Sequence, residues 1–170
     1  MQISSEMPHE HDAIFTVTQA AFKDHAHSQQ TEGHIVDALR KAGALALSLV
    51  ARQDGRVVGH VAFSPVTISD GTPRWYGLGP VSVAPAFQRQ GIGDALIREG
   101  LARLKAMGAA GCVVLGEPDY YARFGFAVQP ALTYPGVPPE YFMALAFSGS
   151  ACGQVSYHPA FYVSTNSSPS

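Results

Sequence analysis

The segment 78–97, LGPVSVAPAFQRQGIGDALI, decides the fold of this chain. Its apolar start predicts a strand over 75–84 that ends at Pro85, and Gly91-Ile92-Gly93 opens an amphipathic helix expected over 91–107. The first amides of a helix have no partner within it and form the positive end of its dipole. Two glycines at that point let the backbone approach an anion closely. The sequence therefore predicts a phosphate or pyrophosphate ligand at residues 89–94.

Two common nucleotide-binding motifs do not fit this loop. A P-loop requires Lys and then Ser or Thr after its second glycine, whereas Asp94 and Ala95 follow Gly93. A dinucleotide fingerprint requires a third glycine three residues after the second, where this chain has Leu96. Both interpretations are weak, so a different phosphate ligand is expected.

The surrounding pattern predicts an α/β chain. Apolar residues at helical spacing indicate helices over 14–22 and 31–41, and residues 1–12 are expected to form a loose N-terminal segment. Two strands, 46–52 and 56–65, are joined by Gln53-Asp54-Gly55, in which Asp-Gly is a strong hairpin signal. The apolar run 112–115 predicts a strand buried on both faces. Strand, helix and buried strand in this order predict a right-handed βαβ unit with parallel strands. Further along, the pattern predicts a short helix over 120–124 and strands over 140–147 and 154–157.

Composition limits the class of protein. With 170 residues and 46% hydrophobic content, the chain suits one domain, expected over 1–163, followed by a disordered tail at 164–170. The net charge of −2 gives no reason to expect nucleic acid as a partner. No apolar run approaches the ~18 residues of a membrane helix, and the N-terminus lacks a secretion signal. A cytoplasmic, membrane-free location is therefore expected.

Cysteine and histidine usage predicts neither a disulfide framework nor a metal site. Cys112 and Cys152 are expected to be buried small hydrophobes. Histidines such as His9 and His11 lie in polar segments without a carboxylate or cysteine cluster at ligand spacing. His60 falls in a predicted strand, where it belongs either to the core or to a cleft.

Two segments resemble the signatures of the GNAT N-acetyltransferase superfamily. The first is Gln88-Arg89-Gln90-Gly91-Ile92-Gly93, which is similar to the family's pyrophosphate-binding motif Gln/Arg-x-x-Gly-x-Gly/Ala. The second is Tyr120-Tyr121-Ala122-Arg123-Phe124-Gly125-Phe126, which is similar to aromatic-Tyr-x-Lys/Arg-x-Gly-Phe. Both occur in order and at the usual separation, and 116–121 resembles a bacterial subgroup known only by the general name acetyltransferase. The resemblance implies an α+β fold with a central mixed, mostly antiparallel sheet, a parallel βαβ cofactor unit and flanking helices.

The resemblance also implies acetyl-CoA as the cosubstrate and a primary amine, on a small molecule or a peptide, as the acceptor that attacks directly. Backbone groups of two strand residues would pair with the pantetheine arm, and the amides of the following loop would hold the pyrophosphate. The implied cofactor-binding residues are Val81, Val83, Gln88, Arg89, Gln90, Gly91, Ile92, Gly93 and Asp94.

Tyr121 aligns with the family tyrosine that protonates the departing thiolate, and Tyr120 is the competing acid. Glu32 and Glu117 are the candidate general bases, although an acid at the start of a helix also simply favours the helix dipole. The run 116–119 stands where the family often has an asparagine, which puts side-chain contacts to pantetheine in doubt. Arg123 is expected either to meet a cofactor phosphate or to be a solvated surface charge.

Three functions follow from the resemblance. The first is acetyl transfer, the second a non-catalytic CoA-binding regulatory module, and the third transfer of a longer acyl chain. The resemblance leaves a homodimer open.

Overall fold

The structure of the protein is a computed structural model that describes residues 1–26 and 28–162. Residues 163–170, which include the predicted disordered tail, lie outside the described residues, and so does His27. The helices are α1 (His11–Phe22), α2 (Glu32–Lys41), α3 (Ile92–Ala106) and α4 (Pro118–Ala122). The strands are β1 (Gln2–Ser5), β2 (Leu47–Gln53), β3 (Arg56–Pro65), β4 (Thr67–Ile68), β5 (Trp75–Val83), β6 (Gly111–Leu115), β7 (Leu132–Thr133), β8 (Phe142–Ala146) and β9 (Gly153–Ser156). Short 3-10 turns cover Pro8–Glu10, Pro85–Phe87, Pro139–Tyr141 and Pro159–Tyr162.

A six-stranded mixed sheet organises the fold, in the order β1-β2-β3-β5-β6-β8. Only β5 and β6 are parallel in this sheet, and every other neighbouring pair in it is antiparallel. Helix α3 connects the two parallel strands, so β5, α3 and β6 form the expected βαβ unit. The mixed, mostly antiparallel sheet with one parallel unit is therefore confirmed.

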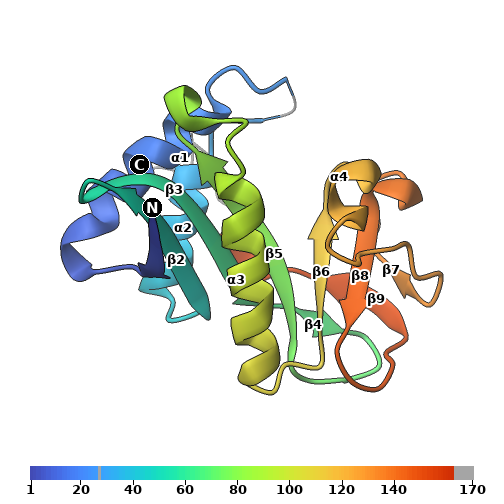
Figure 1. The fold of residues 1–170 in the computed structure, drawn as a ribbon. Coiled ribbons are helices and arrows are strands. Elements are labelled where there is room, and N and C mark those ends of the chain that lie inside the picture. Colours follow the sequence, from blue (N-terminus) through green and yellow to red (C-terminus); the bar gives the residue numbers. More distant parts are fainter. Residues whose placement is uncertain (27, 163–170) are drawn as a thin grey trace, which may run out of the picture.

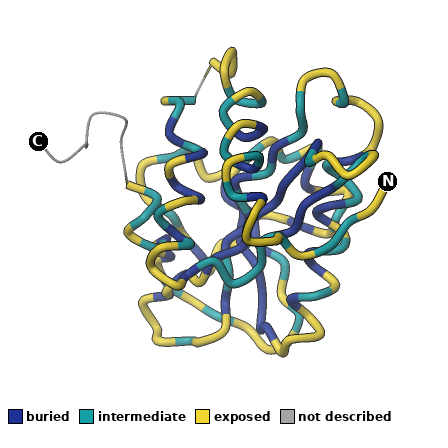
Figure 2. The backbone as a smooth tube through the Cα atoms, turned by 90° about the vertical axis from the view of Figure 1, so that its left-hand side faces the viewer, coloured by how far each residue is buried: buried dark blue, intermediate teal, exposed yellow. Residues whose placement is uncertain are grey.

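The two faces of the sheet are covered by different helices, as Figure 1 shows: α3 crosses one face, and α1 and α2 lie on the other. Gly59 marks the α3 face, because a side chain built there would meet Ile92 and Leu96. The opposite face carries the buried cluster of Ile14, Val36 and Val50. Side chains alternate between the faces of a strand, which divides β3 into one row toward α3 and one row toward α1 and α2. Figure 2 shows the buried chain concentrated in these central strands.

The β2–β3 hairpin forms at the predicted turn. Gln53 pairs with Arg56, which leaves Asp54 and Gly55 as a two-residue loop. Both loop residues have positive φ, +52° and +78°, as a type I′ turn requires. The local Asp-Gly chemistry therefore fixed this register.

Two sequence-based expectations were wrong, and one sheet was not predicted. Residues 2–5 are not a loose segment but the edge strand β1, which pairs with β2 from Gln2↔Arg52 to Ser5↔Leu49. Cys112 is buried as expected, but Cys152 is exposed. The strand predicted over 154–157 forms as β9, Gly153–Ser156. It belongs to a second, three-stranded sheet with β4 and β7, which the sequence did not reveal because β4 and β7 have only two residues each and carry too little periodicity to be read.

Candidate active site

The loop before α3 has the backbone shape of an anion site. Gly91 caps the helix with φ +83°, and Arg89, two residues earlier, also has a positive φ of +64°. Left-handed residues set among right-handed ones turn backbone N–H groups into concavities that bind anions. A Cβ built on Gly91 would meet no atom within 4 Å. The space beside the first amides of α3 is therefore open to a ligand.

Strand β5 has an unpaired edge that leads to this loop. Its pairing with β6 covers only Trp75, Tyr76 and Gly77, and Figure 1 shows the two strands diverging beyond that point. Past β5, the amide of Ala84 donates to the carbonyl of Val58 on β3 at 2.8 Å. Because successive residues of a strand direct their backbone groups to opposite sides, Val81 and Val83 direct theirs away from β3, toward the unpaired edge.

A bulge accompanies the divergence of β5. Val61 of β3 pairs with Val81, whereas Phe63 pairs with Leu78, so β5 holds one extra residue in this interval. The interval contains Pro80, which has no amide hydrogen to donate to a ladder. A bulge bends its strand and increases the local twist, which turns the end of β5 away from the direction of β6.

The predicted cofactor residues Val83 and Gln88 are in contact. The side-chain amide of Gln88 donates to the carbonyl of Val83 at 3.0 Å, across the turn Pro85–Phe87. Ile92 is buried and packs in the main core, so only its backbone faces the loop. A Cβ built on Gly93 would lie 3.5 Å from the Tyr120 hydroxyl, an ordinary contact distance.

Helix α4 carries the two candidate acids beside the start of α3. The Tyr121 side chain is buried, with 8% of its surface exposed, and it packs edge-on against Tyr120 and Phe126. Within the described part of the chain its hydroxyl makes no hydrogen bond. Burial, with a smaller contribution from Cys112, raises the pKa of Tyr121 to about 12. The Tyr121 phenol therefore stays protonated and can still donate its proton.

The hydroxyl of Tyr120, unlike that of Tyr121, makes a hydrogen bond within the described residues. It donates to Asp94 Oδ1 at 2.8 Å, and Arg123 Nη1 lies 2.9 Å from the other oxygen of the same carboxylate. Burial and the hydrogen bond to Asp94 raise the pKa of Tyr120 well above its ordinary value. Burial opposes ionisation of Asp94, but the hydrogen bonds from Tyr120 and Arg123 outweigh it and lower the pKa of that carboxyl. This cluster was not evident in the sequence, because its members lie up to 29 residues apart.

The two candidate bases lie on separate elements. Glu32 begins α2, and both of its carboxylate oxygens accept from Ser28 Oγ, at 2.7 and 2.9 Å. Gln19 ties the chain on both sides of Glu32 to α1, because its side-chain amide donates to the carbonyl of Gln30 and its side-chain oxygen accepts from the amide of Gly33. Glu117 is exposed and caps α4 one turn before Tyr121. Sequence reasoning missed Gln19, because a lone glutamine on a helix gives no local signal.

Comparison with known proteins defines the class. The model of the acetyltransferase (GNAT) family matches residues 11–126, which include the anion loop, the unpaired edge of β5 and both tyrosines. The chain belongs to this family and is an acetyltransferase.

Several individual proteins are similar to it. N-acetyltransferase YhbS of Escherichia coli strain K12 is 39% identical over 127 residues, covering 74% of this chain and 73% of that protein. The crystal structure of a GNAT family acetyltransferase from Brucella melitensis in complex with acetyl-CoA matches with a TM-score of 0.85 and 53% identity, covering 94% of this chain and 97% of that one. The structure of YhbS from E. coli in complex with CoA matches with a TM-score of 0.87 and 33% identity, covering 95% and 92%.

Within residues 1–26 and 28–162, each helix is too short or too polar to span a bilayer. The same residues contain no group of three or more His, Cys, Asp or Glu side chains placed to hold a metal ion.

Proposed function

We propose that this enzyme transfers the acetyl group of acetyl-CoA to a primary amine, and that it holds the cosubstrate along β5 and at the start of α3. The observation that carries the proposal is the unpaired edge of β5 at Val81 and Val83, which runs into the open backbone of Gly91. An extended pantetheine arm can take the place of a neighbouring strand there, and a diphosphate fits the free amides of the helix. The relatives crystallised with acetyl-CoA and with CoA support this placement.

The residues of the loop before α3 are proposed to have different roles in binding the cosubstrate. The amides of Arg89, Gln90, Gly91, Ile92, Gly93 and Asp94 are proposed to face the diphosphate. Gln88 is proposed to shape the turn through its hydrogen bond to Val83. Arg123 is already paired with Asp94, so it neutralises the one carboxylate in the first turn of α3 rather than serving as a free phosphate ligand.

Tyr121 is proposed as the general acid that protonates the CoA thiolate. Its hydroxyl makes no hydrogen bond among the described residues, whereas the hydroxyl of Tyr120 is committed to Asp94. A free thiol has a pKa near ~8.5 and a free phenol near ~10, so this proton transfer is uphill and depends on the Tyr121 hydroxyl being held beside the sulfur as the C–S bond breaks. Glu32 and Glu117 are the surface candidates for removing the proton of the acceptor amine.

Titration calorimetry with CoA and with acetyl-CoA tests the proposed cosubstrate. Heat of binding is expected with both ligands, and release of free CoA is expected when acetyl-CoA is mixed with primary amines. Binding without CoA release for any amine would favour the non-catalytic CoA-binding module. Absence of binding would overturn the proposal.

A second comparison tests the acyl chain. A ligand that binds only the folded protein raises its melting temperature, and at equal concentration a tighter ligand raises it more. Melting curves with acetyl-, propionyl- and succinyl-CoA are expected to show the largest increase for acetyl-CoA. A larger increase with a longer chain would assign the longer acyl donor instead. We also propose a cytoplasmic location, in keeping with two cysteines that are both free.

A further inference from the structure

A row of buried polar side chains lies on the face of the sheet that α1 covers. His60 of β3 is fully buried and pairs directly with Ser82 of β5, so both side chains lie on that face. Ser64 follows on the same face of β3, and Thr18 is buried on α1, which packs against β3 and β5. We call these four residues, Thr18, His60, Ser64 and Ser82, the polar seam.

Each member of the polar seam has an unsatisfied polar atom. Within the described residues, Thr18 Oγ1, His60 Nδ1, Ser64 Oγ and Ser82 Oγ are buried without a hydrogen-bond partner. Unpaired buried polar atoms are costly and rare, and ordered water is their usual partner. The seam adjoins the strand β5, whose unpaired edge is the proposed site of the cosubstrate.

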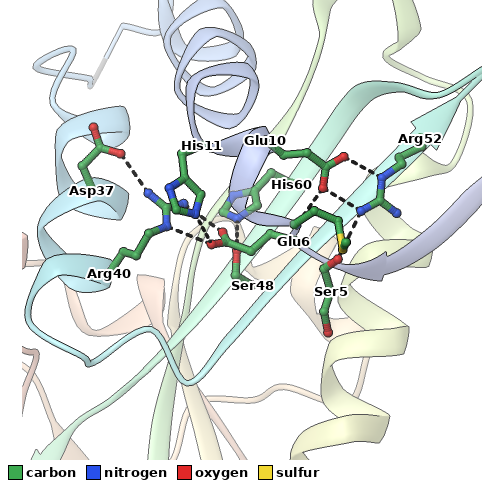
Figure 3. A network of polar contacts seen from close by, with 10 residues as sticks. Ser5, Glu6, Glu10, His11, Asp37, Arg40, Ser48, Arg52 and His60 are labelled. Atoms are coloured by element: carbon green, nitrogen blue, oxygen red, sulfur yellow. Dashed lines mark hydrogen bonds and ion pairs between the residues drawn. The ribbon is translucent and has the colours of Figure 1, made fainter.

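The other ring nitrogen of His60 enters a polar network, drawn in Figure 3. His60 Nε2 lies 2.8 Å from Ser48 Oγ, and Ser48 in turn bonds the Glu6 carboxylate. Arg40 donates two hydrogen bonds of 2.8 Å to Glu6, and His11 Nε2 lies 3.1 Å from it. Burial raises the pKa of Glu6, but these hydrogen bonds and charges outweigh it and keep the carboxyl ionised.

The network fixes where the protons are. The Glu6 carboxylate can only accept, so the single hydroxyl proton of Ser48 points to Glu6. Ser48 Oγ must then accept from His60, which places a proton on Nε2. The neutral imidazole carries one N–H. Nδ1 is therefore the bare nitrogen, and because the two ring nitrogens point in different directions, its lone pair is directed away from Ser48.

The network also reaches solvent. Glu6, Arg40 and Ser48 line a pocket of about 290 Å³, together with the chain around Gly43 and Leu47. The Glu6 side chain is 16% exposed. A continuous path thus runs from the buried Nδ1 of His60, through Nε2, Ser48 and Glu6, to water.

We propose that His60 relays the proton of the acceptor amine from the reacting centre to solvent. The inference rests on the proposed acetyl transfer. As the C–N bond forms and the thioester C–S bond breaks, an N–H bond of the amine also breaks. Its proton passes through water in the polar seam to Nδ1, the Nε2 proton moves to Ser48, and the Ser48 proton moves to Glu6 and out to the pocket. The ring is left with its proton on Nδ1. After the products leave, Nδ1 releases that proton through the emptied cleft while Nε2 regains one from the pocket through Glu6 and Ser48, which restores the starting tautomer. Tyr121 separately protonates the thiolate, and the resulting phenolate takes up a proton from water.

The surroundings of His60 favour a neutral imidazole that passes protons on over an imidazolium that keeps its charge. Burial lowers the pKa of His60 to about 4, with Glu6 raising it and Arg40 lowering it by smaller amounts. The imidazole is therefore neutral near pH 7, with the Nδ1 lone pair free before each turnover. A proton that arrives at Nδ1 makes an imidazolium, which readily releases its other proton, from Nε2, to Ser48.

Nitrogen-15 NMR of the labelled protein tests the proton assignment without any turnover. The His60 ring is expected to show a protonated Nε2 and an unprotonated Nδ1. Ser48→Ala removes the acceptor of Nε2–H and is expected to change this tautomer pattern. A proton on Nδ1 in the wild-type protein would overturn the relay.

Kinetics test the relay itself, with acetyl-CoA and a set of primary amines that includes ethylamine and the less basic trifluoroethylamine. Ser48→Ala and His60→Gln are expected to lower kcat about 100-fold, the usual scale of proton-transfer catalysis, with CoA affinity unchanged. The loss should be smaller for trifluoroethylamine, which gives up its proton more readily. Ser4→Ala is the matched control, because Ser4 bonds Arg52 in the neighbouring network and should keep full kcat.

Two outcomes separate the proposals. If the wild type releases CoA and both relay variants do so equally fast, or lose the same factor with every amine, the relay fails while the acetyltransferase function stands. The relay also fails if Glu32→Gln or Glu117→Gln, and not the His60 variant, shows the loss that depends on amine basicity. If the wild type releases no CoA with any amine, the proposed function fails and the relay fails with it.

Discussion

The hydroxyl of Tyr120 donates a 2.8 Å hydrogen bond to Asp94, and this contact joins α4 to the first turn of α3. Asp94 directly follows the first signature segment, Tyr120 begins the second, and the two residues are 26 positions apart. Arg123 closes the cluster by pairing with Asp94 and by stacking its guanidinium 4.7 Å from the centre of the Tyr120 ring. The anion loop and the acid-bearing helix are thereby held in one fixed arrangement.

Gly91→Val is expected to abolish CoA binding. The substitution places a branched side chain in the open space beside the first amides of α3, at a φ of +83°. Calorimetry with CoA measures the effect. Gly71→Val is the matched control, because Gly71 has a φ of +82° and equally open surroundings in a distant turn. Both variants carry the same backbone strain, so equal CoA affinity in the two would place the diphosphate elsewhere.

Tyr121→Phe is expected to lower kcat by about 100-fold or more, on the usual scale of general acid catalysis, with CoA affinity nearly unchanged. CoA release and calorimetry measure the two quantities. Tyr120→Phe is the comparison, since it removes a hydroxyl that is committed to Asp94. A larger loss of kcat in Tyr120→Phe than in Tyr121→Phe would reverse the assignment of the acid.

Gly116→Ala is expected to displace the Tyr121 ring. A Cβ on Gly116 would lie 2.3 Å from Tyr121 Cε2, a distance that real Cβ atoms do not adopt. Misplacement of a catalytic group by about 1 Å costs on the order of 100-fold in rate. We expect kcat to fall while CoA affinity changes little. A crystal structure of the variant with Tyr121 unmoved, or a variant with full kcat, would contradict this role of Gly116.

Acid pH is expected to destabilise the protein partly through Glu10. The side chain is only 5% exposed and its oxygens lie 2.6 Å from the Arg52 guanidinium. The hydrogen bonds from Arg52, opposed by burial, lower the pKa of Glu10 below its unfolded value near 4.5. A lowered folded pKa contributes stability that is present above about pH 4.5 and is lost as the pH falls through the folded pKa.

Urea denaturation at a series of pH values measures this contribution. At pH 7, Glu10→Gln is expected to lose about 1–3 kcal/mol, the cost of disturbing a buried charged hydrogen bond, and part of the acid sensitivity should disappear. Asp37→Asn removes a carboxylate that is 51% exposed and should change stability by less than about 0.5 kcal/mol. An unchanged acid transition in Glu10→Gln would contradict the prediction.

The local signals of the sequence were sufficient for most of the elements. Asp54-Gly55 predicted the hairpin, the apolar stripe of 91–107 predicted α3, and the run 112–115 predicted β6. Each of these three elements depends on interactions within a few residues, so the local sequence is enough to predict it. Edge strand β1 escaped prediction because its polar sequence, QISS, is stabilised by pairing with β2 almost fifty residues away.

The candidate active site also has one part that the sequence predicts and one part that only the tertiary structure shows. The sequence by itself determined where the helix amides and their glycines lie, because a helix start is a local structure. Only the tertiary structure decided that the Tyr120 hydroxyl is committed to Asp94 while the Tyr121 hydroxyl makes no hydrogen bond within the described residues, and that one ring nitrogen of His60 meets Ser48, which bonds Glu6. Those contacts join residues 12 to 42 positions apart. They depend on how strands and helices pack, which no local pattern of residues encodes.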